Sequence, residues 1–214
     1  MADQEALLDK IKQAVVTGEV EGIAELTKQA LAQGIGARDI LEQVLIPAMD
    51  IVGEEYERGD RYVPEMLISA ETMKASMAVL KPLLVEAGEA RSKGKVVIGT
   101  VEGDLHDIGK NLVVMMLEGA GFEVINLGVE VTAKEFVKAA KEHEPDIVGM
   151  SALLTTTMIH MPEVIEALKQ AGLRDKVKVM IGGAPVTQEY ADKIGADGYA
   201  PDAASATKLA KSLL

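Results

Sequence analysis

The sequence contains no cysteine and no tryptophan among its 214 residues. Without cysteine the chain can form no disulfide, thiolate nucleophile, thiolate-bound zinc site or iron–sulfur cluster. Aromatic side chains are also scarce, with four Tyr and two Phe. We therefore expect a core built from aliphatic residues and from the 11 methionines.

An excess of positive charge and a long apolar run are missing as well. The formal net charge is −12, from 22 Lys and Arg against 34 Asp and Glu, which disfavours binding to nucleic acid or to an anionic membrane. No apolar stretch in the sequence approaches the roughly 20 residues that span a bilayer, and the acidic start of the chain is unlike a secretion signal. We expect a cytoplasmic protein with no nucleic-acid or membrane partner.

Charge and hydrophobic pattern divide the chain into two parts. Residues 1–90 carry 8 Lys or Arg and 17 Asp or Glu, whereas residues 91–214 carry 14 and 17. A small, polar run from Gly88 to Lys95 lies between them and is typical of a linker. We predict a helical domain over residues 1–87, a linker over 88–94 and a second domain over 95–214.

The first part predicts four amphipathic helices. Their apolar stripes cover residues 7–15, 23–31, 40–52 and 66–84. Pro47 is expected to kink the third helix, and Pro64 suits the first turn of the fourth. Apolar residues at steps of three and four share one face of the fourth helix: Met66, Ala70, Met73, Met77, Leu80 and Leu84. Four such helices with short loops predict a bundle.

The second part alternates short β-rich runs with helical segments. The runs cover residues 96–101, 122–127, 146–150 and 177–181, with a weak fifth strand at 197–199, and the helices fall near 108–119, 132–142, 160–171 and after 203. Such alternation predicts a five-strand parallel sheet that is doubly wound, as in Rossmann-like and flavodoxin-like domains. The fold class is α/β, with the helical bundle before the sheet.

Three loops lie where an open parallel sheet binds its ligands, beyond the carboxyl ends of the strands. They cover residues 102–109, 151–157 and 182–185. The first loop matches neither GxGxxG nor GxxxxGK[ST]. The third strand ends in Met150-Ser151, which offers neither the aspartate of a phospho-acceptor receiver domain nor the GxSxG elbow of a serine hydrolase. The common nucleotide and hydrolase motifs are therefore excluded.

The same loops carry another series of residues. DxHxxG stands at Asp104–Gly109, SxL follows after 41 residues at Ser151–Leu153, and Gly182-Gly183 follows after 28 more. This series resembles the signature of cobalamin-binding domains, including the cobalamin-binding module of methionine synthase. The resemblance implies a corrinoid bound base-off and His-on, with His106 as the lower axial ligand of cobalt. Imidazole nitrogen is a suitable ligand for this metal.

The resemblance also implies roles for the neighbouring residues. Asp104 would accept the second ring proton of His106, and a hydroxyl at Thr157, where the family has serine, would support Asp104. His106 would bind and release cobalt, while Asp104 and Thr157 would manage the proton of its ring. The other residues expected to contact the cofactor are Asp107, Ile108, Gly109, Ser151, Leu153, Thr155, Gly182, Gly183, Tyr199 and Ala203.

Simpler interpretations of these residues stay open at this point. His106 could be an ordinary loop histidine, and Asp104 could cap a helix. Gly182-Gly183 could be no more than a turn. Thr155 and Thr157 could be polar residues that follow a strand without contacting a ligand.

The combination of a helical module with one cobalamin domain resembles the small corrinoid proteins of anaerobic methyltransferase systems. They serve methylamines, methanol, methyl thiols, methoxyaromatics or betaines. Such a chain is no enzyme by itself: it carries a methyl group on cobalt from a substrate-specific methyltransferase to a second methyltransferase, and a reductive activase restores it. The helical module would cover the upper face of cobalt, with Tyr62, Met66 and Met73 as candidate covering residues, although the methionine stripe by itself is better explained as bundle core.

Two rival functions stay open from the sequence. A sensor or storage module would bind cobalamin without methyl transfer. A metal-dependent hydrolase would instead use the cluster of Asp104, His106 and Asp107 as metal ligands. The neighbouring genes would separate a carrier from a sensor, and the colour of the purified protein would exclude the hydrolase.

Overall fold

The computed structural model describes residues 2–87 and 92–214 and divides into two compact units, Met1–Arg91 and Ser92–Leu214. The division falls inside the segment 88–94 that the sequence indicates as a linker. Residues 88–91 of that segment lie outside the described residues, so the domain limits at 87 and 95 stay predictions. In the described part of the chain, no helix combines the length and apolar character needed to cross a membrane.

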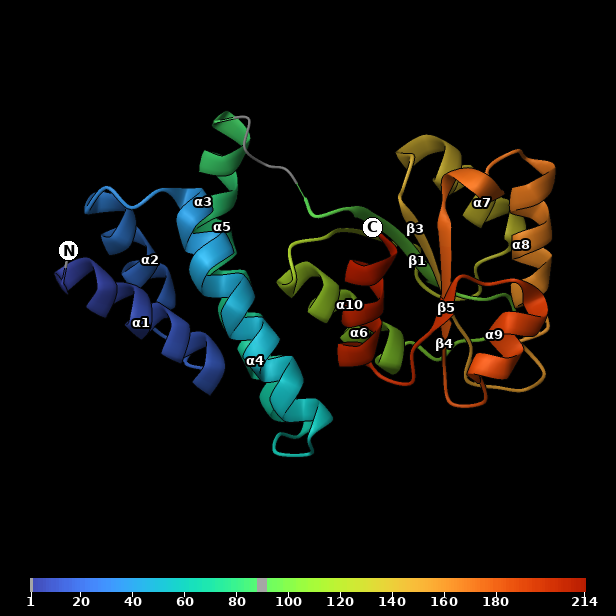
Figure 1. Cartoon of the computed structure of the whole chain (residues 1–214), viewed down its shortest axis with the longest axis horizontal. Coiled ribbons are helices and arrows are strands. Elements are labelled where there is room, and N and C mark those ends of the chain that lie inside the picture. Colours follow the sequence, from blue (N-terminus) through green and yellow to red (C-terminus); the bar gives the residue numbers. More distant parts are fainter. Residues whose placement is uncertain (1, 88–91) are drawn as a thin grey trace. The chain divides into compact units, whose positions relative to one another are not determined.

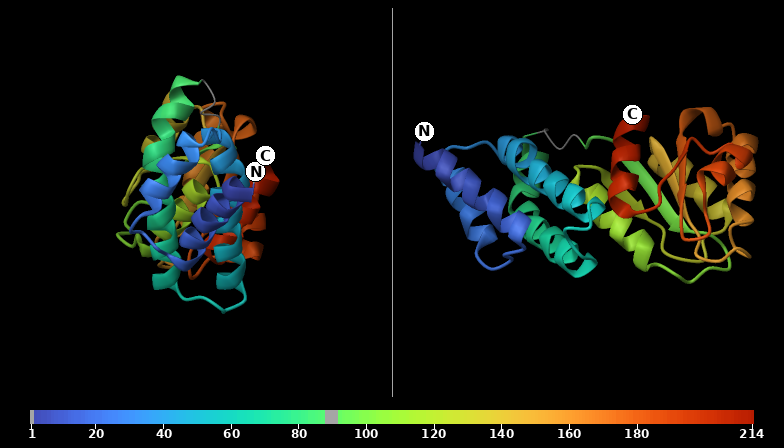
Figure 2. Two further views of the ribbon diagram at one scale, coloured as in Figure 1. Left: turned by 90° about the vertical axis from the view of Figure 1, so that its left-hand side faces the viewer. Right: turned by 60° about the horizontal axis from the view of Figure 1, so that its bottom comes forward.

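The first unit is built from helices, as predicted (Figure 1). Its elements are α1 (Ala2–Thr17), α2 (Ile23–Ala32), α3 (Ala37–Ile40), the π-helical turn η1 (Leu41–Leu45), α4 (Ile46–Glu57) and α5 (Val63–Glu86). Because α3, η1 and α4 follow one another without a break, they form the third helical rod of the bundle. Two further views show the loop that joins α4 to α5 at one end of this unit (Figure 2).

Pro47, where the sequence predicts a kink, is preceded by a π-helical turn, and the kink itself stays a prediction. The amide of Ile46 donates to the carbonyl of Leu41, five residues earlier, instead of the usual four. Proline lacks the N–H that would continue the normal helical ladder. A widened turn of this kind lets the chain enter α4 with Pro47 in its first turn, where no donor is needed.

The apolar face predicted for α5 is mostly buried. The buried members are Met66, Ala70, Met73, Leu80 and Leu84, whereas Met77 is half-buried. Polar side chains of the same helix are buried beside them: Ser76 lies 2.7 Å from Thr27 of α2, hydroxyl to hydroxyl. The face of α5 therefore combines methionine packing with a hydroxyl contact that the apolar period does not reveal.

The second unit contains a five-strand parallel sheet in the order β2-β1-β3-β4-β5. Its elements are β1 (Lys95–Thr100), α6 (Ile108–Gly119), β2 (Glu123–Asn126), α7 (Ala133–His143), β3 (Ile147–Ser151), α8 (His160–Gln170), the 3-10 turn η2 (Arg174–Lys176), β4 (Lys178–Gly182), α9 (Gln188–Ile194), β5 (Gly198–Tyr199) and α10 (Ala203–Leu213). This order confirms the predicted doubly wound α/β domain of the flavodoxin-like type.

Helices cover both faces of this sheet (Figure 1). α6 and α10 pack on one face and α7, α8 and α9 on the other, so consecutive residues of β1 enter different cores. Val96 belongs to the α6/α10 core and Val97 to the core that contains Phe136 of α7. A strand buried on both faces reads as a continuous apolar run, as the sequence shows here.

The order of the strands sets the position of a ligand site. β1 lies between β2 and β3. The chain runs from β1 to β2 on one side and then continues to β3 on the other side, so the strand order reverses at β1. Ligands of such sheets bind in the crevice beyond the carboxyl ends of the strands at this reversal. The loops after β1 and β3 meet there.

Candidate functional site

Asp104 and His106 lie in the loop after β1, at the carboxyl edge of the sheet. One carboxylate oxygen of Asp104, Oδ1, lies 2.7 Å from Nδ1 of His106 and accepts the backbone N–H of the same residue at 3.0 Å. The hydroxyl of Thr100, the last residue of β1, donates to the carbonyl of His106 at 3.0 Å. These contacts fix the loop around a buried carboxylate and leave the side chain of His106 51% exposed.

The second oxygen of Asp104 joins this loop to the loop after β3. Oδ2 accepts the hydroxyl of Thr157 at 2.7 Å and the backbone N–H of Leu153 at 2.8 Å, with that of Leu154 at 3.4 Å. Thr157 is itself buried. The structure thus brings Asp104, His106 and Thr157 into one chain of contacts across the crevice, although 53 residues separate Asp104 from Thr157.

Asp104 is ionised in this environment. Burial by itself raises the pKa of its carboxyl, but hydrogen bonds from the His106 amide, the Thr157 hydroxyl, the Leu153 amide and the His106 ring hold the pKa well below its ordinary value. An ionised carboxylate can only accept hydrogen bonds, so Nδ1 of His106 is the donor. In the neutral ring, Nε2 then keeps the electron pair that binds a metal.

The geometry argues against two simpler interpretations of Asp104. The N-cap position of α6 is occupied by Asp107, so Asp104 is not the cap of that helix. Both of its oxygens accept donors from the protein, which leaves no open face for a metal ion. Among the described residues, no group of three or more His, Asp and Glu side chains could hold a metal ion, and this disfavours the hydrolase hypothesis.

The other candidate contact residues lie along the same edge of the sheet. Ser151 ends β3 opposite Gly182 of β4, and Tyr199 of β5 lies opposite Ile181. Exposure differs among them: Ile108, Gly109, Leu153 and Thr155 are exposed, Asp107, Ser151, Gly182, Gly183 and Tyr199 are half-buried, and Ala203 is buried. The structure therefore gathers these residues at one edge, and their contact with a cofactor stays a prediction.

The fold requires glycine at one of two positions along this edge, Gly183, and does not require it at the other, Gly109. Gly183 has a φ of +130°, and a Cβ there would overlap the carbonyl oxygen of Ala152, so the backbone of the crevice itself requires glycine. At Gly109 the φ is not positive and a Cβ would meet nothing within 4 Å. The fold has no need of glycine at 109, and open space at a helix start beside His106 suits a bulky ligand that approaches the backbone.

Exposed apolar side chains are concentrated in the segments that follow β1 and β3. Ten large apolar residues of the described chain are exposed, and five of them lie in the loops after β1 and β3 or at the first residue of α6: Leu105, Ile108, Leu153, Leu154 and Ile159. Exposed apolar groups gathered around a few polar ones are typical of ligand sites. The donor set and these exposed apolar side chains together fit a corrin ring over His106. Sequence reasoning missed Leu105, Leu154 and Ile159, although apolar residues in polar loops are a usable signal.

The three candidate covering residues are placed differently by the structure. Met66 and Met73 are 1% and 2% exposed, so they are part of the buried face of α5 and offer no surface to a cofactor. That part of the expectation is corrected, because one helical period cannot tell a face packed in a bundle from a face that covers a ligand. Tyr62, in contrast, is 74% exposed.

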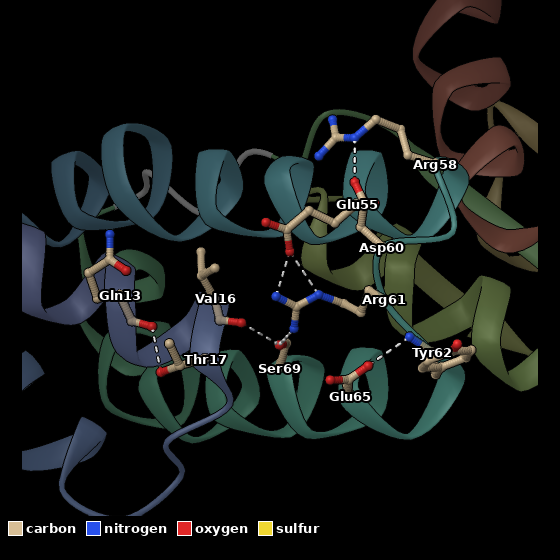
Figure 3. Close-up of polar contacts among 10 residues, drawn as sticks. All are labelled: Gln13, Val16, Thr17, Glu55, Arg58, Asp60, Arg61, Tyr62, Glu65 and Ser69. Atoms are coloured by element: carbon tan, nitrogen blue, oxygen red, sulfur yellow. Dashed lines mark hydrogen bonds and ion pairs between the residues drawn. The ribbon is translucent and has the colours of Figure 1, made fainter.

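A polar cluster around Arg61 fixes the loop that presents Tyr62 (Figure 3). Arg61 donates to Oε2 of Glu55 through Nε and Nη2, at 2.9 and 2.6 Å, and to the hydroxyl of Ser69 at 3.2 Å. Ser69 donates in turn to the carbonyl of Val16, at 3.3 Å. The guanidinium group thus joins α1, α4 and α5, and Tyr62 follows it directly in the chain. Sequence reasoning did not identify Arg61.

Comparison with known proteins agrees with the class that the fold and the site define, a cobalamin-binding protein. A B12 binding domain model matches residues 94–208, more than half of the chain, and a second B12 binding domain model matches residues 7–81. The chain belongs to the B12-binding family.

Named relatives are similar along the full length of the chain. A corrinoid protein of Desulfitobacterium hafniense (strain Y51) is 45% identical over 211 residues, 98% of each chain. Trimethylamine corrinoid protein 1 of Methanosarcina acetivorans is 45% identical over 215 residues, 100% of each chain. Among solved structures, a chain of the methanol:cobalamin methyltransferase complex of Methanosarcina barkeri matches with a TM-score of 0.86 and 32% identity, over 97% of this chain and 79% of that one.

Proposed function

We propose that this chain is a cytoplasmic corrinoid protein that carries a methyl group on cobalt between a substrate-specific methyltransferase and a second methyltransferase. The observation that carries the proposal is the fully buried, ionised Asp104, which orients a half-exposed His106 at the strand-order reversal of the sheet. The names of the relatives, which are corrinoid proteins for trimethylamine and dimethylamine, support this function over a sensor or a store. Methylamines and methanol are the proposed methyl donors.

A corrinoid held by these residues, base-off and His-on, would supply a cobalt centre that can accept and give up a methyl group. Nε2 of His106 is the proposed lower ligand of this cobalt. Asp104 holds the proton at Nδ1 when the ring is neutral, and the Thr157 hydroxyl stabilises the charge on Asp104. The chain itself therefore binds, orients and tunes the cofactor, and the partner methyltransferases perform the transfer.

The slot for the nucleotide tail is proposed to lie between the loops after β3 and β4. Ser151 would donate to a ring nitrogen of the tail, and Leu153 would pack against the ring. Gly109 gives the tail close access to the start of α6, where backbone N–H groups favour anionic groups. Partners are proposed by chemistry: the two methyltransferases, and a reductive activase that returns oxidised cobalt to the state that accepts a methyl group.

A methylation assay tests the proposed function. We expect the reduced, cobalamin-loaded chain to change its absorption spectrum when trimethylamine, dimethylamine or methanol is added with the matching methyltransferase. Each methyltransferase without its substrate serves as the control. If cobalamin binds base-off and no donor with its methyltransferase alters the spectrum, the chain is a sensor or a store and not a carrier of these methyl groups.

The substitution Asp104→Asn is expected to slow methyl transfer and shift the Co(II)/Co(I) midpoint potential. An amide is a weaker acceptor for the ring proton and adds donors where the buried oxygens now meet only donors, and losses of this kind typically cost about 10–100-fold in metal affinity or activity. Potentiometric titration and the methylation assay measure both effects. The control is Glu163→Gln, because Glu163 contacts Nδ1 of His160 at the same 2.7 Å and neither residue is a hydrogen-bond partner of Asp104 or His106. An unaltered potential and rate in Asp104→Asn would reject the role of Asp104.

Removing the helical unit tests whether it covers the cofactor. Residues 92–214 are expected to bind cobalamin, because all proposed contacts to the lower side lie there and the unit has its own two cores. Added cyanide should reach cobalt faster in this fragment than in the full chain, as measured by stopped-flow absorbance. A fragment that cannot hold cobalamin would place part of the site in the helices. Equal cyanide rates would leave the helices no covering role.

A further inference from the structure

A lysine is buried at the start of α6, the helix that follows the loop with His106. Lys110 lies in the first turn of α6 and is 3% exposed, although lysine is rarely buried to this degree. Burial lowers the pKa of Lys110, while the negative charge of Asp107 opposes this change. Its position at one helical step from Val114 and two from Leu117 places it on the buried face of the helix.

The amino group of Lys110 joins two elements. Nζ donates to Oδ1 of Asn111 at 2.7 Å and to Oδ1 of Asn126 at 2.9 Å. Asn126 is the last residue of β2 and also donates to Oδ1 of Asn111, at 3.3 Å. The start of α6 and the carboxyl end of β2 are therefore held together by one lysine and two amide side chains.

On the α6 side, this junction reaches the residue next to His106. Nδ2 of Asn111 donates to Oδ2 of Asp107 at 3.0 Å. Asp107 is the N-cap residue of α6, yet its carboxylate makes no capping hydrogen bond. The carboxylate is thus directed to Asn111 and the junction, and this fixes the chain immediately after His106.

On the β2 side, the junction fixes the loop that braces Asp104. Oδ1 of Asn126 accepts the N–H of Gly128 at 3.0 Å, and the carbonyl of Gly128 accepts the N–H of Thr100 at 3.0 Å. Two residues later the N–H of Glu130 donates to the carbonyl of Asp104, at 3.1 Å. The loop after β2 therefore supports the His106 loop at its start, next to Thr100, and at Asp104.

Packing alone does not account for Lys110. A buried amino group costs desolvation, and an apolar side chain of similar length would occupy the same space without that cost. What the amino group adds is a pair of directed hydrogen bonds that join the start of α6 to the carboxyl end of β2. We propose that Lys110 is a positioning residue that holds the His106 loop between α6 and β2, so that Nε2 of His106 stays aligned with cobalt.

The inference rests on the proposed function, because it takes His106 as the cobalt ligand. The test compares Lys110→Met and Asn126→Leu with Asn126→Asp, which keeps the acceptor for Nζ. In cobalamin-saturated protein reduced to Co(II), we expect the first two variants to show a fraction without the imidazole nitrogen splitting in the electron spin resonance spectrum. Their cobalamin affinity should fall about 10-fold. Asn126→Asp should keep the wild-type spectrum.

Val114→Ala is the control for a loss of stability, because it removes buried apolar atoms one turn further along α6. Thermal unfolding of the apo-proteins identifies variants of matched stability. The inference is overturned if Lys110→Met and Asn126→Leu keep the wild-type spectrum and affinity, or if Val114→Ala of equal stability loses the splitting to the same extent. If Lys110→Met does not fold, the variant at the exposed residue of the junction, Asn126→Leu, decides alone.

A parallel His106→Gly sample separates this inference from the proposed function. If His106→Gly keeps the nitrogen splitting, His106 is not the ligand, and the part of the proposed function that assigns His106 to cobalt fails. If His106→Gly loses the splitting while Lys110→Met and Asn126→Leu keep it, the ligand stands and only the role of Lys110 is rejected.

Discussion

The variant His106→Gly is expected to bind cobalamin at least about 100-fold more weakly than the wild-type chain, because the loss of a ligand should exceed the 10–100-fold typical of its supporting residues. Asp104 would also lose the ring from its hydrogen-bonded set, while its bonds to Leu153 and Thr157 are unaffected. Titration of the apo-protein with cobalamin measures the affinity. His143→Gln serves as the control, since His143 ends α7 away from the crevice.

Added imidazole gives this variant a second readout. If the loss reflects an empty ligand position, imidazole in the buffer should restore part of the affinity of His106→Gly and leave the wild-type affinity unchanged. An affinity of His106→Gly within a few-fold of wild type, or a loss that is equally large in His143→Gln, would contradict the assignment of His106.

The second large effect is expected at two glycines: a substitution at Gly109 should weaken cobalamin binding, and a substitution at Gly183 should destabilise the fold. In Gly109→Val the apo-protein should keep its thermal stability, because a Cβ at 109 has open space and glycine is a poor helix former. Cobalamin affinity should fall by more than about 10-fold, since the new side chain occupies the approach to His106. Gly183→Ala should instead destabilise the apo-protein by about 1–3 kcal/mol, because its Cβ meets a backbone oxygen at a strained φ.

Thermal unfolding of the apo-proteins and cobalamin titration separate these two results. The account predicts a binding defect without a stability defect for Gly109→Val and a stability defect for Gly183→Ala. Normal cobalamin affinity in Gly109→Val would mean that no part of the ligand passes the start of α6. An equally unstable Gly109→Val would mean that the glycine serves the fold.

The sequence was sufficient for the architecture because the two parts of the chain have different hydrophobic periods. Steps of three and four predicted the long helix α5, and continuous apolar runs predicted four of the strands and the fully parallel sheet. The helix α9 was missed because its seven residues are too few to show a helical hydrophobic period. The capping residue Thr187 was its only other sequence signal. The sequence predicted a kink at Pro47, and the π-helical turn before it was not predicted.

The site was predictable where its residues are ordered by sequence spacing and unpredictable where they meet through folding. Asp104, His106 and Thr157 follow a recognisable series, and the structure brings them together. No sequence motif indicates the contact of the Leu154 amide with Asp104 or that of Lys110 with Asn126, because the partners lie in different elements of the fold. A lysine at one helical step from Val114 on an otherwise apolar face was the available signal for Lys110.

Electron spin resonance of the Co(II) form tests the central claim most directly. Cobalamin-loaded chain is prepared with ordinary histidine, with isotopically labelled histidine, and as His106→Gly. The account predicts a splitting from an axial nitrogen that changes with the label and disappears in His106→Gly, which identifies the protein imidazole as the lower ligand. A splitting that is insensitive to the label and persists in His106→Gly would show that the cofactor keeps its own base, and it would contradict the proposed role of His106.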